Sequence, residues 1–148
     1  MGIIKLFKKL YRSFIWSGSE LEFFKFSELG SKNFKQKRYF EAIAYFDKAL
    51  NLRDYIQSEL ISDEYSQRGQ AKLKIGDYKG AKKDFNKSIK QADYNFDDFF
   101  ICEDYFYRGI TKFYLKNFKG SLKDFYRAKV NKDEIADLDL KEIEAWIQ

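Results

Sequence analysis

Large, small and polar positions recur along most of the chain with the spacing of amphipathic helices. Three segments share one pattern: an aromatic residue, a glycine four positions later, a polar turn, and then a small–aromatic–small series with steps of four and three. The glycines are Gly30, Gly69 and Gly109, and each is followed after 12 residues by the first small residue of its series. Residues three and four apart share one face of a helix. Each segment therefore predicts two helices joined by a tight turn.

The small–aromatic–small series predicts how the two helices of a pair meet. A glycine carries no side chain, so the second helix can approach the first closely at that point. Alternating small and large residues on the facing helices then interdigitate. The three series are Ala42, Phe46 and Ala49; Ala81, Phe85 and Ser88; and Ser121, Phe125 and Ala128.

This combination resembles the tetratricopeptide repeat, in which a helix pair carries small residues at its eighth, twentieth and twenty-seventh positions and aromatic residues at its seventeenth and twenty-fourth. Tyr65 to Ile89 match best, and the resemblance covers about residues 23–133. It implies an all-α fold, a right-handed α-solenoid of antiparallel helix pairs with an extra helix at each end. We expect the repeats at about 20–54, 55–94 and 95–133, after a break at 17–19.

The chain departs from that pattern in two ways. The glycines are offset by 39 and 40 residues, whereas the usual period is about 34. The surplus falls between pairs, where residues 55–61 and 96–101 are apolar enough to extend the first helix of the next pair. Arg68 and Arg108 replace the usual leucine, and we expect their stems to pack while the guanidinium reaches a carboxylate or a helix end.

The two ends predict additional helices. Residues 3–15 have one apolar half and one lysine-rich half. This segment fits a helix that packs on the solenoid, or one that lies on an anionic membrane surface. The candidates for membrane contact are Ile3, Ile4, Lys5, Phe7, Lys8, Lys9, Leu10, Arg12, Phe14 and Trp16. Residues 134–148 predict a capping helix over the last pair.

The composition argues against an enzyme. The chain has no histidine, which removes the commonest general base and the commonest zinc ligand. Cys102 is the single cysteine, so the chain can form no intramolecular disulfide and no cysteine-based metal cluster. Acid pairs such as Asp97–Asp98 suit helix starts better than catalysis. We therefore predict no cofactor and no catalytic site, and we expect a cytoplasmic protein or one peripheral on the inner face of a membrane.

The resemblance implies a concave groove lined by the first helix of each pair. Chaperone-binding members of that family hold a terminal carboxylate with lysine at the fifth position and asparagine at the ninth; here Ser27, Ser31, Ser66 and Gln70 stand there. Such a clamp is not supported. A protein or peptide partner remains the prediction, unless the aromatic third pair is core beneath the C-terminal helix. The candidate partner-binding residues are Lys35, Asp63, Ser66, Gln70, Lys74, Glu103, Phe106, Ile110, Phe113 and Tyr114.

A basic stripe follows the predicted second helices of pairs two and three. The net charge is +5, which is modest for a nucleic-acid-binding protein. Asp84 and Asp124 interrupt the stripe in sequence, so we favour a solvated face over a phosphate-binding one. The sequence thus predicts a non-catalytic interaction scaffold. A membrane-tethered subunit is the second hypothesis and nucleic-acid binding the weakest.

Overall fold

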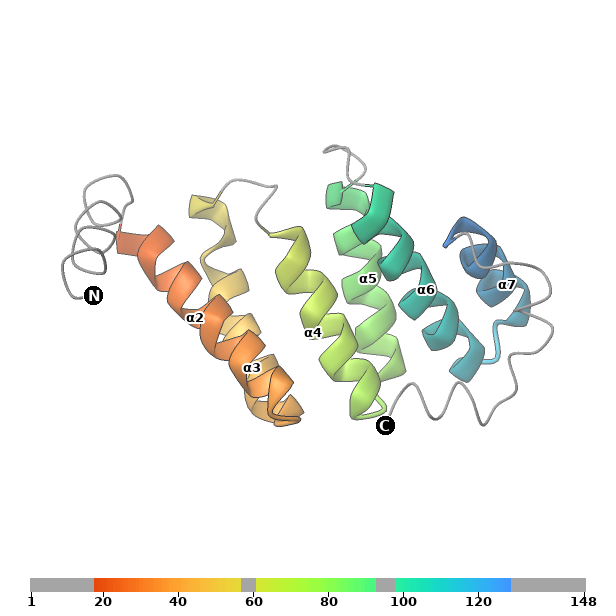
Figure 1. Ribbon diagram of the computed structural model, residues 1–148, viewed down its shortest axis with the longest axis horizontal. Coiled ribbons are helices and arrows are strands. Elements are labelled where there is room, and N and C mark those ends of the chain that lie inside the picture. Colours follow the sequence, from red (N-terminus) through yellow and green to blue (C-terminus); the bar gives the residue numbers. More distant parts are fainter. Residues whose placement is uncertain (1–17, 57–60, 93–97, 129–148) are drawn as a thin grey trace.

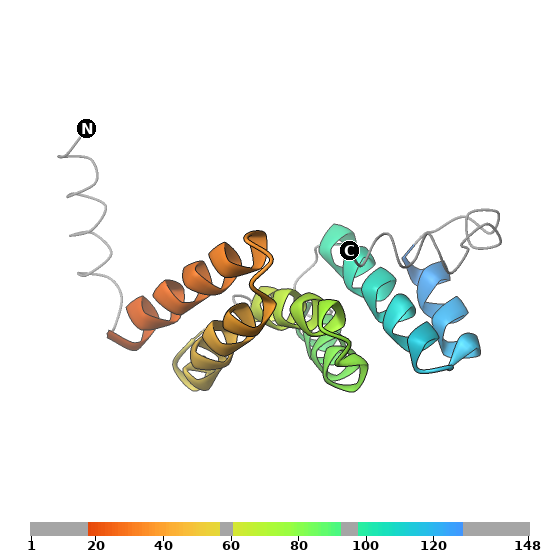
Figure 2. The same cartoon turned by 90° about the horizontal axis from the view of Figure 1, so that it is seen from below.

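Six α-helices form three antiparallel pairs in the computed structural model, which describes residues 18–56, 61–92 and 98–128. The helices follow one another side by side along the molecule (Figure 1), and a view from below shows the pairs in succession (Figure 2). No strand occurs within those three ranges. The elements are α2 (Gly18–Lys35), α3 (Tyr39–Asn51), the 3-10 helix η1 (Arg53–Tyr55), α4 (Ser62–Lys74), α5 (Tyr78–Ala92), α6 (Asp98–Tyr114) and α7 (Phe118–Arg127). The architecture is the expected all-α solenoid of helix pairs.

Each helix pair closes around a contact between a glycine and a phenylalanine. A Cβ added at any of the three glycines would lie 2.7–2.9 Å from a ring carbon on the second helix. That separation is far below normal contact, so a larger residue would displace a buried ring. The contacts pair Gly30 with Phe46, Gly69 with Phe85, and Gly109 with Phe125. The close approach predicted from the repeat spacing is confirmed.

The turn after the first helix of each pair contains a residue with left-handed backbone. Lys37 and Lys116 have φ of 60° and Gly76 has φ of 80°. The next residue in each turn donates its backbone N–H to a carbonyl five residues earlier, at 2.9 Å. This arrangement satisfies carbonyl groups that the end of a helix otherwise leaves unpaired. It reverses the chain in few residues and sets the second helix against the first.

Arg68 pairs with a buried carboxylate of its own helix pair and also contacts an acid of the first pair. Its Nε and Nη2 donate to the two oxygens of Asp84 at 2.8 and 2.6 Å, and its Nη1 donates to Asp47 at 2.6 Å. Lys72 Nζ lies 2.8 Å from the same Asp84 carboxylate, which is 1% exposed. The expectation that this arginine reaches a carboxylate is confirmed.

Arg108 repeats this arrangement between the second and third pairs. It donates to both oxygens of Asp124 at 2.7 and 2.8 Å, and its third contact is Asn86 Oδ1 at 2.8 Å. Lys112 Nζ forms a further ion pair with Asp124, 2.6 Å from its Oδ2. Asp84 and Asp124 therefore face the helix–helix interior, and the expectation that they interrupt a surface stripe is wrong.

The connections differ from the expected helix extensions. Tyr55 and Ile56 do not lengthen α4, because Tyr55 lies in η1, Ile56 has extended backbone and α4 begins at Ser62; residues 57–60 lie outside the described residues. Ile56 instead packs against a buried cluster that includes Leu50, so the loop contributes apolar contacts that a longer helix would have placed elsewhere. α6 does begin early, at Asp98, and has 17 residues against 13 in α4.

The N-terminal break is also placed differently from the expectation. Gly18 and the residue after it belong to α2; a glycine is tolerated at this exposed helix start. The expected membrane-contact helix and C-terminal cap lie outside the described residues. Within the described residues, no helix has the length and apolar character needed to cross a bilayer.

Candidate functional site

A hollow of about 630 Å³ lies between the first helices of the first two pairs. All of its lining residues belong to α2 or α4, the helices that the repeat pattern places on the concave face. They are Leu21, Glu22, Phe24, Lys25, Ser27, Glu28, Ser31, Asp63 and Glu64. We call this the α2/α4 hollow. A surface depression built by two successive repeats is suited to an extended or helical segment of another chain.

Most of the predicted partner-binding residues do not line this hollow. Asp63 is the one candidate that does. Phe24, Ser27 and Ser31, which occupy groove positions on the first helix of the first pair, also line the hollow. Lys35 is exposed at the end of α2. Gln70 and Lys74 are partly buried further along α4.

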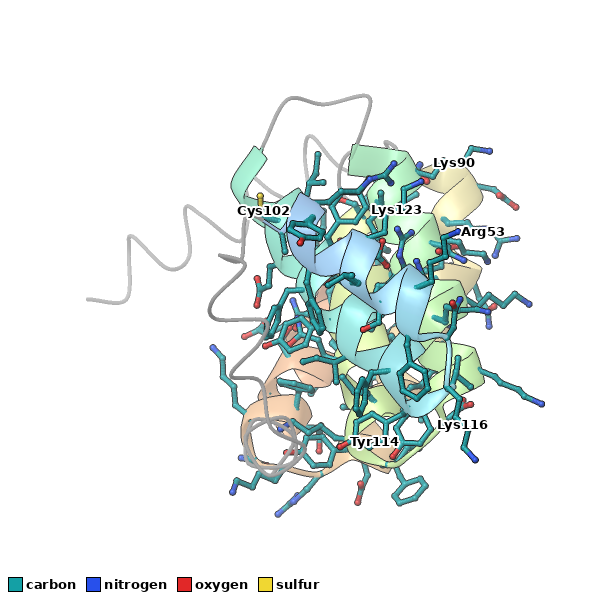
Figure 3. All side chains as sticks on the ribbon, turned by 90° about the vertical axis from the view of Figure 1, so that its right-hand side faces the viewer. Arg53, Lys90, Cys102, Tyr114, Lys116 and Lys123 are labelled. Atoms are coloured by element: carbon teal, nitrogen blue, oxygen red, sulfur yellow. The ribbon has the colours of Figure 1, made fainter. Side chains whose placement is uncertain are left out.

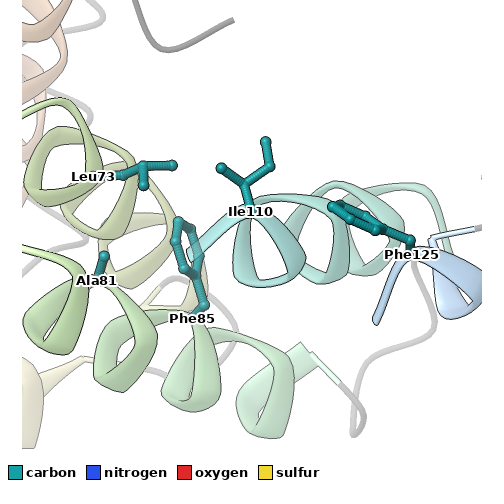
Figure 4. Packing of buried hydrophobic residues seen from close by; sticks show 5 residues of the cluster. All are labelled: Leu73, Ala81, Phe85, Ile110 and Phe125. Atoms are coloured by element: carbon teal, nitrogen blue, oxygen red, sulfur yellow. The ribbon is translucent and has the colours of Figure 1, made fainter. Parts of the chain in front are cut away.

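The aromatic third pair contributes to the core. Ile110 is 1% exposed and forms a buried cluster with Leu73, Ala81, Phe85 and Phe125 (Figure 4). Three other candidates, Phe106, Phe113 and Tyr114, are partly buried and pack against the same cluster. Ile110 is therefore inaccessible to a partner, and its assignment as a contact residue is wrong. Tyr114 stacks on Tyr78 with ring centroids 4.6 Å apart, so its ring supports the junction between pairs.

Serine hydroxyls at the groove positions link successive repeats. Ser27 Oγ donates to Glu64 Oε1 at 2.6 Å, and Ser31 Oγ donates to Gln67 Oε1 at 2.7 Å. Ser66 Oγ donates to Asp104 at 2.5 Å. The hydroxyl hydrogen of Ser66 is thus used within the protein rather than offered to a partner. At the positions where chaperone-binding tetratricopeptide repeats carry clamp residues, Ser27, Ser31 and Ser66 of this chain form hydrogen bonds between successive repeats.

The α2/α4 hollow is acidic. Four carboxylates and one lysine line it. Burial raises the pKa of Glu64 to about 7, Ser27 opposes that rise by hydrogen bonding, and the charge of Asp63 adds to it. On the neighbouring α6, burial and then the charge of Asp63 raise the pKa of Glu103, another predicted partner-binding residue. A negative field therefore extends from α2 towards α6.

Glu64 is the residue that sequence reasoning missed. It is 6% exposed, and its Oε2 has no hydrogen-bond partner among the described residues. The position lies outside the face positions of the repeat, so the pattern assigned it no role. In the second and third pairs, an acid stands directly before the tyrosine that precedes the repeat glycine by four residues, as Glu64–Tyr65 and Asp104–Tyr105. This repeated acid was the sequence feature that could have identified Glu64.

Basic side chains gather at the opposite ends of the same helices. The last turns of α2 and α4 carry lysines, whereas their first turns carry acids. Each sign lies at the helix end where the helix dipole favours it. Burial and then the charge of Lys37 lower the pKa of Lys74. The concave face is therefore polarised, with the α2/α4 hollow at its acidic end.

Lysines on α5 and α7 form a separate exposed surface. Lys87 lies over the ring of Tyr65 at 4.9 Å, and Figure 3 shows Arg53 and Lys90 projecting on the side away from Cys102. The exposed lysines of these two helices are Lys79, Lys83, Lys87, Lys90, Lys119 and Lys123. In the described ranges no cluster of three histidine, cysteine or acidic side chains is placed to hold a metal ion.

Comparison with known proteins identifies the fold. No family model matches the chain, and no curated protein does. Two solved structures illustrate the likeness. The first tetratricopeptide domain of Spaghetti (RPAP3), bound to the HSP90 peptide SRMEEVD, is 21% identical with a TM-score of 0.63, over 86% of this chain and 94% of that one. The OM64 tetratricopeptide domain of Arabidopsis is 21% identical with a TM-score of 0.65, over 88% and 97%. The chain has the tetratricopeptide-repeat fold.

Proposed function

We propose that this protein is a non-catalytic interaction module that binds a segment of a partner protein in the α2/α4 hollow. The observation that carries the proposal is the hollow itself, because two successive repeats build it: α2 contributes polar and apolar residues, and α4 contributes two acids. Its volume of about 630 Å³ falls in the range of small-molecule sites, about 300–1,000 Å³, which is room for side chains of a bound segment. The fold supports the proposal, since one structure with the same fold holds a peptide.

Peptide selection followed by mapping tests this function. The full chain would be screened against a displayed peptide library, and amide chemical shifts would be recorded with each selected peptide. We expect the largest shifts in α2 and α4. Glu28→Trp, at an exposed lining residue, should fill the hollow and weaken binding by about tenfold or more.

The matched control is Ala44→Trp, which adds the same side chain to an exposed position of α3 outside the hollow. It should leave peptide affinity unchanged. Equal loss in both variants, or shifts confined to α5 and α7, would refute binding in the hollow. A library that yields no binder would count against the function itself.

A membrane tether is a second proposal, and it is favoured by one observation. Residues 3–15 combine an apolar half with four basic residues and no acid. Flotation with anionic liposomes would compare the full chain with a variant in which Phe7 and Leu10 are changed to Asn. Equal flotation of the two proteins would remove this proposal.

A further inference from the structure

The charge of the α2/α4 hollow selects among partner segments. Glu22, Glu28, Asp63 and Glu64 contribute carboxylates, and Lys25 contributes the one ammonium group in the lining. Like charges brought together across an interface oppose binding, whereas complementary charges accelerate association and fix register. An acidic segment would therefore be repelled here and a basic segment attracted.

The buried carboxylate of Glu64 is half satisfied. Ser27 donates a hydrogen bond to Oε1. Oε2 has no hydrogen-bond partner among the described residues, although Glu64 is only 6% exposed. A buried acceptor without a donor is unfavourable, and a ligand donor that pairs with it removes that penalty. Oε2 is closed to solvent in the free protein, but Glu64 lines the hollow, so a rotation of this side chain towards the hollow would offer the unpaired oxygen to a donor of a bound segment.

A metal ion is the wrong occupant for this arrangement. The acids of the described ranges do not converge as a metal-ligand group. An ammonium or guanidinium group needs only one or two carboxylates, and its alkyl stem needs apolar surface. Leu21 is 44% exposed, and it lies with Phe24 in the same lining.

We propose that the α2/α4 hollow binds a lysine or arginine side chain of the partner segment, with Glu64 and Asp63 as its carboxylate acceptors. This inference rests on the proposed function and specifies the chemistry of the partner. It also distinguishes this chain from the structure that holds SRMEEVD, a peptide with three acidic residues and one arginine. The fold is shared, but the charge that this hollow would recognise is the opposite.

Three capped peptides of equal length test the charge preference. They would carry the same two leucine anchors and differ at three positions, which are all lysine, all glutamine or all glutamate. Titration calorimetry at pH 8 and low salt, with the full chain, should show the lysine peptide binding about tenfold or more tighter than the glutamine peptide. The glutamate peptide should be the weakest.

Two variants and one control locate the acceptors. Glu64→Gln and Asp63→Asn should each weaken the lysine peptide by about tenfold, since each removes one charged acceptor. Glu41→Gln removes an exposed acid of α3 that does not line the hollow, and it should change nothing. Circular dichroism would verify that all three variants fold.

Each other outcome has a defined meaning. If the glutamine or glutamate peptide binds in the hollow as tightly as the lysine peptide, the cationic preference is overturned and the proposed function stands. Equal weakening by Glu41→Gln would overturn the assigned acceptors. If no peptide binds, both proposals fail. Concentration-dependent self-association that Glu64→Gln abolishes would replace the partner segment with the basic residues 1–16 of a second copy.

Discussion

The two junctions between successive helix pairs place a buried carboxylate at the same repeat position but satisfy it differently. At the second junction, Asp104 is 2% exposed and accepts from Ser66 and Ser88, each at 2.5 Å. At the first junction, Glu64 accepts from Ser27 alone. The first-pair equivalent of Ser88 is Ala49, which has no hydroxyl group to donate.

This difference determines what each junction can do. Burial raises the pKa of both groups, to about 6 for Asp104, where two serines oppose the rise, and to about 7 for Glu64, where one does. The second junction is a closed polar contact. The first retains an acceptor without a donor, and it is the junction that lines the α2/α4 hollow. A single repeat position can thus separate a structural contact from a binding surface.

Removing Arg68 or Arg108 should have the largest effect, because each pairs with a buried carboxylate of its own helix pair and contacts the preceding pair. Arg68→Met leaves the Asp84 carboxylate, 1% exposed, with Lys72 alone, and we expect a loss of about 3–5 kcal/mol in the free energy of unfolding. Arg108→Met should be similar, because Asp47 and Asn86 occupy exposed positions where one contact contributes less than about 1 kcal/mol. Urea unfolding measures both. A loss below 1 kcal/mol would contradict the importance of these buried ion pairs.

The pH dependence of stability should separate the two carboxylates. The folded pKa of Glu64 is about 7 and its ordinary value 4.5, so the folded state binds this proton more tightly than the unfolded state. The stabilisation is complete below about pH 4.5 and is lost as the pH rises through 7, by about 3 kcal/mol. The stabilisation of the folded state that comes from protonated Asp104 is smaller, and it is lost as the pH rises from 3.8 to about 6.

Glu64→Gln provides the test of that profile. The variant should be more stable than the parent protein at pH 8, and its stability should change little between pH 6 and 8. Asp124 has a lowered pKa, so its stabilisation is lost only as the pH falls below about 4, outside this window. Thermal unfolding across pH 5–8 measures the effect, and an unchanged slope in the variant would disprove the assignment.

Removing one donor to Asp104 at the second junction should leave a buried carboxylate oxygen unpaired, as Glu64 has at the first junction. Ser88→Ala removes the donor to Asp104 Oδ2 and leaves a buried oxygen unpaired, at an expected cost of about 1–3 kcal/mol. The pKa of Asp104 should rise further, so the loss should be greater at pH 8 than at pH 5. A loss that does not vary with pH would indicate that packing, rather than the hydrogen bond, is affected.

Adding a hydrogen-bond donor for Glu64 at the first junction should have the smallest effect on stability. Ala49→Ser introduces a hydroxyl at the repeat position of Ser88, and at pH 8 it should stabilise the protein by about 1 kcal/mol or less. It should also weaken the lysine peptide, because the added donor competes for Glu64. A destabilised variant with unchanged peptide affinity would show that the longer glutamate side chain places Oε2 beyond the reach of that hydroxyl.

Much of the fold was predictable because it depends on local spacing. Gly69, Ala81 and Phe85 lie within 16 residues of each other, and helical periodicity alone places them on facing surfaces. The salt bridge from Arg68 to Asp84 spans the same short interval. Within one repeat, residue type and offset were sufficient to predict the packing and to expect that the arginine reaches a carboxylate or a helix end, but not to identify Asp84 as that carboxylate.

The contacts between repeats depended on the tertiary structure. Ser27 and Glu64 are 37 residues apart, and their meeting depends on how α4 packs against α2, which helical periodicity within a repeat does not determine. The burial of Ile110 was likewise decided by packing across the second junction, where Leu73 and Phe85 of one pair meet the next. Sequence alone determined the repeating unit, because its packing is local; the stacking of units decided which polar groups are closed, which acceptor stays open and where the hollow lies.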